Sequence, residues 1–367
     1  MKLCGSHRVV CHRPAPATLT RRAGSTPRPS RLLSHRPRFL PNQAASAPQA
    51  TTTSAGMTGE VVIPRLPTGP IMGPEAVSLL KTFTRLQNGS DVRGIAIDGV
   101  PKEPVSLTPG IAFFIGAAFV EWLESKRPEG SQGPIVVSVG RDPRISGPMM
   151  EAALVSGIAS TGAHVDTFGI ATTPCMFYSI VATGRYQGAI MLTASHMPFN
   201  SNGIKFFTKA GGLEKADIAQ LLQRAADACA AAGVLAGQPL SETPHLLRAA
   251  MAVQPGCANQ VEFMPTYSAF LRDLIKKGVD SKANHELPLA GLKIVVDAGN
   301  GSGGFFADQV LAPLGADVAG SRFLDPDGSF PNHIPNPEHP SAMKSGAEAV
   351  REVGADLGIV FDTDVDR

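Results

Sequence analysis

The chain has 367 residues, enough for two or three domains that each bury a core of their own. It is 43% hydrophobic and 17% charged, and no apolar run is long enough to span a bilayer, which excludes an integral membrane protein of the helical type. The formal net charge is +2, and most of the excess of basic residues lies in the N-terminal segment described next, so nucleic-acid binding loses its main electrostatic argument.

The first 56 residues form a basic leader. They hold Lys2 and eight arginines, and the first acidic residue of the chain is Glu60; without these nine cations, 24 basic residues stand against 31 acidic ones. An acid-free, Arg- and Ser-rich segment without an apolar core is typical of an organelle transit peptide, and a disordered basic tail is the alternative. Its seven prolines oppose the helix of a mitochondrial presequence. We therefore expect a chloroplast (plastid stroma) protein, with mitochondrion or cytoplasm as alternatives, and cleavage near residues 45–60.

Strands and helices alternate from about residue 84. The periodicity predicts strands over 134–139, 163–169 and 187–192, and helices over 148–160 and 213–232. This alternation is typical of a three-layer α/β/α domain with a mixed, mostly parallel sheet. We place the first domain at 84–233 and a Gly-, Pro- and Ser-rich linker at 234–258.

Two loops of this domain carry arginines. SDVRG at 90–94 places Arg93 before a glycine, and GRDPRISG at 140–147 contains Arg141 and Arg144. Ser146 is a candidate N-cap for the helix that follows. Arg141 and Arg144 either bind phosphate or shape a neighbouring loop, and a surface turn held by an internal Arg–Asp pair explains the sequence equally well.

The strand 187–192 leads into TASHMPFNSNGIK at 193–205. Ser195 and His196 are adjacent, and neighbouring side chains on an extended segment point to opposite faces, so they are a poor nucleophile–base couple. A serine phosphorylated here would add two negative charges and an oxygen ligand for a metal. Lys205 would neutralise this charge or transfer a proton to a substrate hydroxyl. A turn rich in hydrogen-bonding groups is the alternative.

The second domain, at 259–367, repeats the alternation. Helices are predicted over 267–277, after DAGNGSGG (297–304) and over 342–353, and strands over 292–296, 317–319 and 355–361. The Pro- and Asn-rich segment 325–340 predicts a long structured turn region. Because ligands collect beyond the carboxyl ends of parallel strands, we expect the loops 140–147, 193–205 and 362–367 to share a site.

The last six residues, DTDVDR, contain three alternating carboxylates. In an extended segment Asp362, Asp364 and Asp366 lie on one face, where they repel one another unless a cation neutralises them. Oxygen ligands alone favour Mg²⁺ or Ca²⁺ over zinc. Arg367 beside such a metal indicates a phosphate contact. A solvated acidic segment is the alternative.

Taken together, these motifs resemble those of the α-D-phosphohexomutase superfamily, the phosphoglucomutases and phosphomannomutases. TASHMPFNSNGIK resembles the phosphoserine signature TASHNPxxxNGxK, and FDTDVDR resembles the magnesium loop DGDxDR. SDVRG and GRDPRISG resemble the family's xDxRG and GxDxRxS loops, and VVDAGNGSGG and DGSFPNHIPNPEHP lie in the expected order. The resemblance covers residues 84–367.

The resemblance implies a role for each residue. Ser195 would be the phosphoserine, and one Mg²⁺ would bind its phosphate together with Asp362, Asp364 and Asp366. Arg93, His196 and Lys205 would line the reaction centre, and Arg141, Arg144 and Arg367 would bind phosphate. The implied reaction interconverts hexose 1-phosphate and hexose 6-phosphate, of glucose or mannose, through a hexose 1,6-bisphosphate intermediate that also serves as activator.

The sequence departs from the family pattern in two ways. Met197 stands where the signature has Asn, and the chain stops at Arg367, without the third and fourth domains that recognise the sugar and clamp the distal phosphate. We therefore expect little or no mutase activity from the chain as given, and the second domain to be incomplete. The alternatives are a non-catalytic sugar-phosphate-binding or regulatory phosphoprotein and, less in keeping with the motifs, a serine phosphatase. Neither nucleic acid nor membrane is an expected partner, and the oligomeric state is not predicted.

Overall fold

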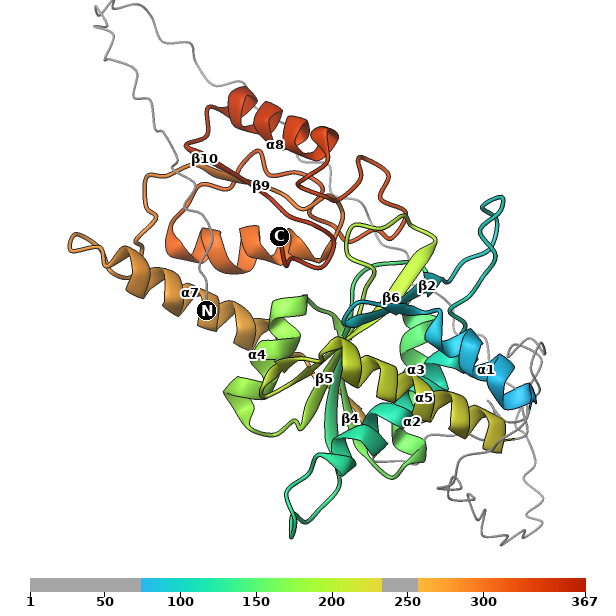
Figure 1. Ribbon diagram of the computed structural model, residues 1–367. Coiled ribbons are helices and arrows are strands. Elements are labelled where there is room, and N and C mark those ends of the chain that lie inside the picture. The colour runs from blue at the N-terminus through green and yellow to red at the C-terminus, as the bar shows by residue number, and fades with distance from the viewer. Residues whose placement is uncertain (1–73, 233–256) are drawn as a thin grey trace, which may run out of the picture. The chain divides into compact units, whose positions relative to one another are not determined.

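The computed structural model describes residues 74–232 and 257–367 (Figure 1). The predicted leader at residues 1–56 lies outside these ranges, as does the predicted linker except for its last two residues. Among the helices in these two ranges, none combines the length and the apolar character that a membrane span requires.

The first domain follows the predicted alternation, with element ends shifted by one or two residues. Its helices are α1 (Pro74–Thr84), α2 (Pro109–Ser125), α3 (Gly147–Ser160), α4 (Thr173–Thr183) and α5 (Lys215–Ala231). Its strands are β1 (Gln87–Asn88), β2 (Asp91–Ile95), β3 (Val136–Arg141), β4 (His164–Ile170), β5 (Gly188–Leu192), β6 (Ser201–Thr208), β7 (Gly211–Gly212) and β8 (Ala258–Gln260).

These strands form one mixed sheet, the large sheet, in the order β1-β2-β6-β5-β3-β4-β8, with β7 paired to β6. The pairs β5–β3, β3–β4 and β4–β8 are parallel, whereas β6 runs antiparallel to both β2 and β5. Strand β8 extends this sheet beside β4, although the sequence analysis places residue 258 in the linker and residues 259–260 in the second domain.

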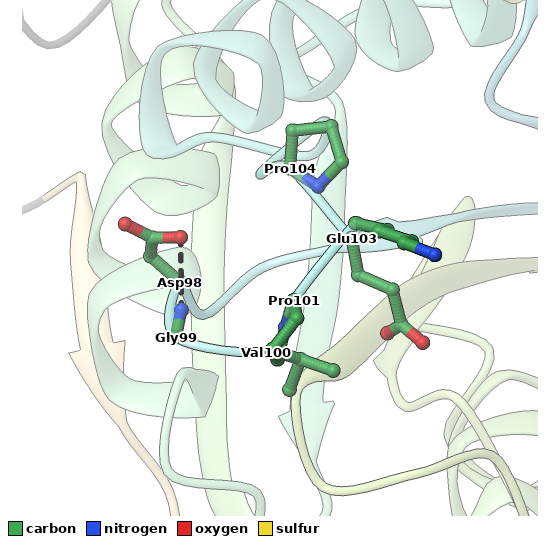
Figure 2. A pocket seen from close by; sticks show the side chains of 7 residues that line it. Asp98, Gly99, Val100, Pro101, Glu103 and Pro104 are labelled. Carbon is green, nitrogen blue, oxygen red and sulfur yellow. Dashed lines mark hydrogen bonds between the residues drawn. The ribbon is translucent and has the colours of Figure 1, made fainter.

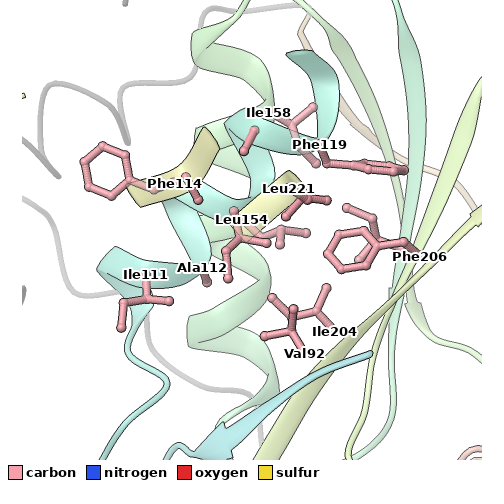
Figure 3. Packing of buried hydrophobic residues seen from close by; sticks show 14 of the residues in the cluster. Val92, Ile111, Ala112, Phe114, Phe119, Leu154, Ile158, Ile204, Phe206 and Leu221 are labelled. Carbon is pink, nitrogen blue, oxygen red and sulfur yellow. The ribbon is translucent and has the colours of Figure 1, made fainter. Parts of the chain in front are cut away.

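Helices cover both faces of the large sheet, which is why every residue of β5 is buried. Ile190 and Leu192 belong to the core shared with α2, α3 and α5. Figure 3 shows part of this core, with Phe119 and Phe206 among the labelled residues. Ala189 and Met191 point to the opposite face, into a core built by α4 and its neighbours. The predicted three-layer α/β/α class is thereby confirmed for this domain.

The second domain is built on two parallel strands, β9 (Ile294–Asp297) and β10 (Leu357–Val360). Helix α8 (Pro340–Val353) packs on these strands, and Gly346 lies so close to Val360 that an added Cβ would come within 2.5 Å of it. On the other side Val296 shares a core with Val310 and Leu314. Helix α7 (Met264–Val279) packs against both this layer and α4.

Two predictions for the second domain are wrong. Residues 317–319 form only an isolated bridge with Lys293, because the Asp317 carboxylate accepts the Ala319 N–H and Gly320 then turns the chain at φ +98°. The segment after DAGNGSGG is not an α-helix. The 3-10 turn η2 (Ser302–Gly304) ends this motif, and the residues after it form the π-helical η3 (Phe306–Leu311) and the 3-10 turn η4 (Ala312–Leu314), which contains Pro313 and so lacks one amide hydrogen.

Candidate functional site

The serine loop, residues 193–200, joins β5 to β6 and begins at a buried carboxylate. The Thr193 hydroxyl donates to Asp142 Oδ2 at 2.7 Å and accepts the Ser195 N–H at 2.8 Å. Ser195 is fully buried and has φ +51°, a left-handed conformation that serine seldom adopts. Such conformations persist where the surroundings enforce them and cluster at functional sites.

The side chain of Arg144 makes many of the hydrogen bonds that hold Ser195 and its loop in this conformation. Its Nη2 donates to the carbonyls of Ser195 (2.6 Å) and Met197 (2.8 Å), and its Nη1 donates to those of Pro198 (2.6 Å) and Ser201 (3.0 Å). Its Nε donates to Asp142 at 3.1 Å, inside a fully buried ion pair. We call this set of contacts the carbonyl brace. It holds the serine loop at three points and the start of β6 at a fourth, all from a single side chain.

The carbonyl brace uses all five N–H donors of Arg144, so no donor is left for a phosphate. This geometry argues against the phosphate-binding role expected for Arg144 and favours the alternative, that it shapes the serine loop. Ser146 lies at the N-cap position of α3, but its hydroxyl accepts from Asn202 and makes no capping bond.

Arg93 lies next to Ser195. Its Nη2 donates to Ser195 Oγ at 3.4 Å and to Asp91 at 2.9 Å, and its Nη1 donates to the Ala194 carbonyl at 3.0 Å. The buried Nε has no hydrogen-bond partner among residues 74–232 and 257–367. The guanidinium of Arg93 therefore lies beside the serine oxygen. Arg93 belongs to β2, and β2 pairs with β6, the strand that follows the serine loop.

His196 is half-buried beside the same cation. Burial lowers the pKa of His196, and the positive charges of Arg367 and Arg93 lower it further. Its buried Nδ1 has no partner among the described residues. A neutral imidazole at this position is able to accept a proton at neutral pH.

The metal loop, residues 362–367, brings its three carboxylates together by turning. One oxygen from each of Asp362, Asp364 and Asp366 lies within 4.8 Å of the others. The Asp362 Oδ1 accepts the N–H groups of Asp366 and Arg367, and Val365 adopts φ +63°. The predicted cluster is thus present, but the extended conformation predicted for it is wrong.

This cluster suits a divalent cation. Asp362 Oδ2 and Asp364 Oδ1 are buried and accept no hydrogen bond from the part of the chain that the structure describes. The Arg367 Nε lies 3.9 Å from Asp362 Oδ2, beyond hydrogen-bond distance. Burial, followed by the charges of Asp364 and Asp366, raises the pKa of Asp362 to about 8. All the donors are hard oxygens, as Mg²⁺ prefers.

Lys205 connects the serine loop to the metal loop. It lies on β6, and its Nζ donates to Asp364 Oδ2 and Asp366 Oδ2, both at 2.7 Å. Burial alone would lower the pKa of Lys205, but its two carboxylate partners raise it above the ordinary value. The side chain is therefore a fixed positive charge in this arrangement.

Two further contacts to the metal loop escaped the sequence analysis. Thr173, the first residue of α4, donates its hydroxyl to Asp364 Oδ2 at 2.5 Å and its N–H to the Asp364 carbonyl at 2.9 Å. Ser302 donates its N–H to the Thr363 carbonyl at 2.8 Å. At Gly301 an added Cβ would lie 2.8 Å from that same carbonyl, which explains why the second glycine of DAGNGSGG is a glycine.

The segment 325–340 contacts the loop that carries Arg144. Gly328 bridges to Arg144, and a Cβ at Gly328 would lie 2.2 Å from the Pro143 carbonyl. The ring of Phe330 lies under the Arg144 guanidinium at 5.4 Å. His333 Nε2 bonds Asp297 Oδ1 at 2.9 Å, anchoring this segment at the end of β9.

The two remaining predicted arginines have different surroundings. Arg141 pairs with Glu151 of α3 at 3.0 Å, and its Nη1 donates to the Asp142 carbonyl. Arg367 lies 3.9 Å from Asp362, Asp366 and Glu338, with about a third of its side chain exposed (31%). Arg367 is thus placed at the metal loop, whereas the contacts of Arg141 hold the start of α3.

A shallow hollow of about 450 Å³ lies elsewhere, over the loop 98–104 (Figure 2). It is formed by one surface loop. That loop is tied to the serine loop through Asn200 Nδ2, which donates to Glu103 Oε2 at 2.8 Å. The hollow contains neither Ser195 nor the carboxylates, and we therefore place the candidate site at the serine and metal loops.

Comparison with known proteins gives matches to two family models. Residues 84–230 match the phosphoglucomutase/phosphomannomutase α/β/α domain I, and residues 268–367 match domain II of the same family. Together these ranges contain the serine loop and the metal loop.

Individual proteins also match. The chain is 32% identical over 278 residues to a phosphomannomutase/phosphoglucomutase of Pseudomonas syringae, covering 76% of this chain and 50% of the relative. It is 34% identical over 290 residues to a phosphoglucosamine mutase of Frankia casuarinae, covering 78% and 55%. A crystal structure of a phosphoglucomutase/phosphomannomutase family protein from Burkholderia thailandensis matches with a TM-score of 0.51 and 26% identity, covering 78% and 53%. The chain thus spans about half the length of these relatives.

Proposed function

Because the chain belongs to the α-D-phosphohexomutase superfamily, we propose that it carries the phosphoryl-transfer centre of a hexose-phosphate mutase. The reaction interconverts hexose 1-phosphate and hexose 6-phosphate through a phosphoserine. The substrates are phosphates of glucose or mannose, and the relatives named phosphoglucosamine mutase add glucosamine phosphate as a candidate.

One observation carries the proposal. Lys205, from the strand that follows the serine loop, bonds two carboxylates of the metal loop. Serine, cation-binding carboxylates and a buried ammonium are therefore tied together, and Arg93 reaches the serine oxygen itself. The positive charge of the Arg93 guanidinium would partly neutralise a phosphoryl group on Ser195.

The first transfer starts from phosphorylated Ser195. The free hydroxyl of the hexose phosphate attacks phosphorus and loses its proton to a base, while the bond from phosphorus to Ser195 Oγ breaks and Oγ takes up a proton to give the serine hydroxyl. Neutral His196 suits this proton acceptor, since the pKa of His196 is lowered by burial and by neighbouring cations. The hexose 1,6-bisphosphate then reorients in the site, and its other phosphoryl group is transferred to Ser195 by the reverse of the first step.

The remaining residues stabilise charge. Lys205 is held protonated by Asp364 and Asp366, so it neutralises charge rather than removing a proton. Asp362, Asp364 and Asp366 would hold Mg²⁺ together with a phosphate oxygen, and the bound ion would supply electrostatic stabilisation of the transferring group. Arg367 lies beside it and suits a phosphate contact. Arg144 holds the serine loop in place.

The test starts with Ser195 itself. The chain is incubated with ³²P-labelled glucose 1,6-bisphosphate and Mg²⁺, and the labelled peptide is mapped. We expect label on the peptide that contains Ser195, and none in Ser195→Ala. Label elsewhere, or no label on correctly folded protein, would refute the phosphoserine assignment.

A coupled assay separates the alternatives. Glucose 1-phosphate and mannose 1-phosphate are supplied with the bisphosphate, and hexose 6-phosphate and free phosphate are measured. Interconversion supports the mutase. Release of free phosphate without interconversion supports a serine phosphatase, and phosphorylation without turnover supports a regulatory phosphoprotein.

We also propose a subcellular location from the composition of the leader. Its acid-free, Arg- and Pro-rich composition supports import into a plastid. Residues 1–60 fused to a fluorescent protein should accumulate in chloroplasts and lose the leader on import. Retention in the cytoplasm or import into mitochondria would contradict this location.

A further inference from the structure

The N-terminus of α4 holds a single residue of the metal loop at two points. The Thr173 hydroxyl donates to Asp364 Oδ2 at 2.5 Å, and the Thr173 N–H donates to the Asp364 carbonyl at 2.9 Å. Asp364 is fully buried and Thr173 is 8% exposed, so water does not compete freely for these bonds. One threonine of the first domain thus fixes both the main chain and the side chain of Asp364.

These bonds determine which oxygen of Asp364 is left over. Oδ2 accepts from Thr173 and from Lys205, whereas Oδ1 is buried and accepts from no donor among the residues that the structure describes. Asp362 Oδ2 is likewise buried and accepts no hydrogen bond from the described residues. A carboxylate with one oxygen bound by the protein and the other unpaired is oriented as a monodentate ligand.

Helix capping does not account for the Thr173 contacts. The N-cap of α4 is the preceding residue, Thr172, whose hydroxyl accepts the Cys175 N–H at 3.2 Å. Thr173 lies inside the first turn, where its hydroxyl is not needed by the helix. The positive end of the helix also faces the Asp364 carbonyl through the Thr173 N–H.

We propose that Thr173 is a positioning residue for the divalent cation of the metal loop, acting through Asp364. The inference rests on the proposed function, because it takes the carboxylates of the metal loop to be cation ligands. It goes further by assigning to a helix of the first domain a part in the affinity of a site whose carboxylate ligands come from the second.

The test is Mn²⁺ binding, followed by electron paramagnetic resonance of the free ion, on the full chain without substrate. Thr173→Val keeps the shape and removes the hydroxyl, and we expect the Kd for Mn²⁺ to rise roughly tenfold or more, as when outer-shell partners of metal ligands are lost. Thr173→Ser restores the donor and should return the Kd to within about twofold of the original.

Thr172→Val is the matched control. It changes the neighbouring buried threonine and its cap while leaving the Thr173 hydroxyl in place. It should lower the melting temperature and leave the Kd for Mn²⁺ unchanged. If Thr173→Val fails to fold, Thr173→Ala, which adds no bulk, takes its place and should show the same loss.

The outcomes separate the two claims. An unchanged Kd in Thr173→Val, or equal losses in Thr173→Val and Thr172→Val, would overturn the positioning role and leave the metal site intact. Absence of Mn²⁺ binding in the unaltered chain would overturn the metal site and the positioning role together. A tenfold loss that Thr173→Ser rescues and Thr172→Val does not reproduce would support the inference.

Discussion

Ser195 keeps its left-handed backbone conformation through bonds that other residues make. Arg144 is the largest contributor, since one guanidinium binds four carbonyls of the loop and the next strand while pairing with buried Asp142. Removing one partner of a buried ion pair leaves the other uncompensated, which costs far more than a surface pair is worth.

We therefore expect Arg144→Met to lower the free energy of unfolding by about 3–5 kcal/mol. Urea unfolding followed by circular dichroism measures this change. Arg141→Met, three residues away and half-buried in its pair with Glu151, is the control and should cost about 1 kcal/mol or less. Equal losses in the two variants would contradict the carbonyl brace.

His333 predicts a pH dependence of stability. Its Nε2 faces the Asp297 carboxylate and its Nδ1 faces the Ile334 carbonyl, both at 2.9 Å, so both nitrogens must carry a proton to donate. The bond to Asp297 raises the pKa of His333 against the effect of burial. Because the folded-state pKa lies above the unfolded value of about 6.5, the stabilisation is complete below about pH 6.5 and is lost as the pH rises through the folded-state pKa.

Urea unfolding between pH 5.5 and 9 tests this dependence. In the unaltered chain stability should fall as the pH rises through the folded-state pKa of His333, and His333→Gln should lack that part of the decline. Exposed His285→Gln should keep the full decline. A decline that is identical in all three proteins would assign the effect to other groups.

At the scale of elements, the segment 325–340 is positioned by how closely Gly328 approaches the loop of Arg144. An added Cβ would lie 2.2 Å from the Pro143 carbonyl and 2.6 Å from the Ile145 nitrogen, both of them rigid backbone atoms. Gly328→Ala should therefore lower the free energy of unfolding by about 1–3 kcal/mol. Gly278→Ala in α7 meets no atom within 4 Å and should be neutral or stabilising, by roughly 0.5–1 kcal/mol. A neutral Gly328→Ala would mean that the two loops do not pack this closely in solution.

Much of the element order follows from the sequence. The alternation of apolar runs and amphipathic segments identifies β3, β4, β5, α3 and α5 to within two residues, and the rule for parallel strands places their following loops together. The wrong predictions fall where local chemistry overrides periodicity, as when the Asp317 side chain caps its own turn.

The contacts of the site were harder to predict. The carbonyls that Arg144 binds become neighbours only when the serine loop folds back, and no residue type marks them in advance. Thr173 was missed because Thr-Thr-Pro is also an ordinary helix start, so its sequence gives no hint of a partner 191 positions away. Contacts made through main-chain atoms depend little on residue type, so the sequence does not reveal them.

At the scale of the whole molecule, the metal loop is held by both domains: Thr173 and Lys205 from the first and Ser302 from the second. A cation that binds only the folded chain stabilises it by RT ln(1 + [L]/Kd), about 2.7 kcal/mol at 100 times the Kd. Mg²⁺ should therefore raise the melting temperature in a concentration-dependent way.

Asp362→Asn is expected to abolish this gain. It keeps the oxygen that accepts from Asp366 and Arg367 but removes a buried charge, so without Mg²⁺ the variant should be at least as stable as the unaltered chain. Differential scanning calorimetry with and without Mg²⁺ measures both effects, with exposed Asp98→Asn as the control. An undiminished Mg²⁺ effect in Asp362→Asn would place the cation elsewhere.

Strand β5 ends three residues before Ser195, and none of its five residues reaches solvent. Ile190 and Leu192 fill one core, and Ala189 and Met191 fill the other. An inherited change in the volume of either core therefore shifts the strand from which the serine loop starts. Apolar substitutions in either core are therefore expected to change the position of Ser195 as well as the stability of the fold.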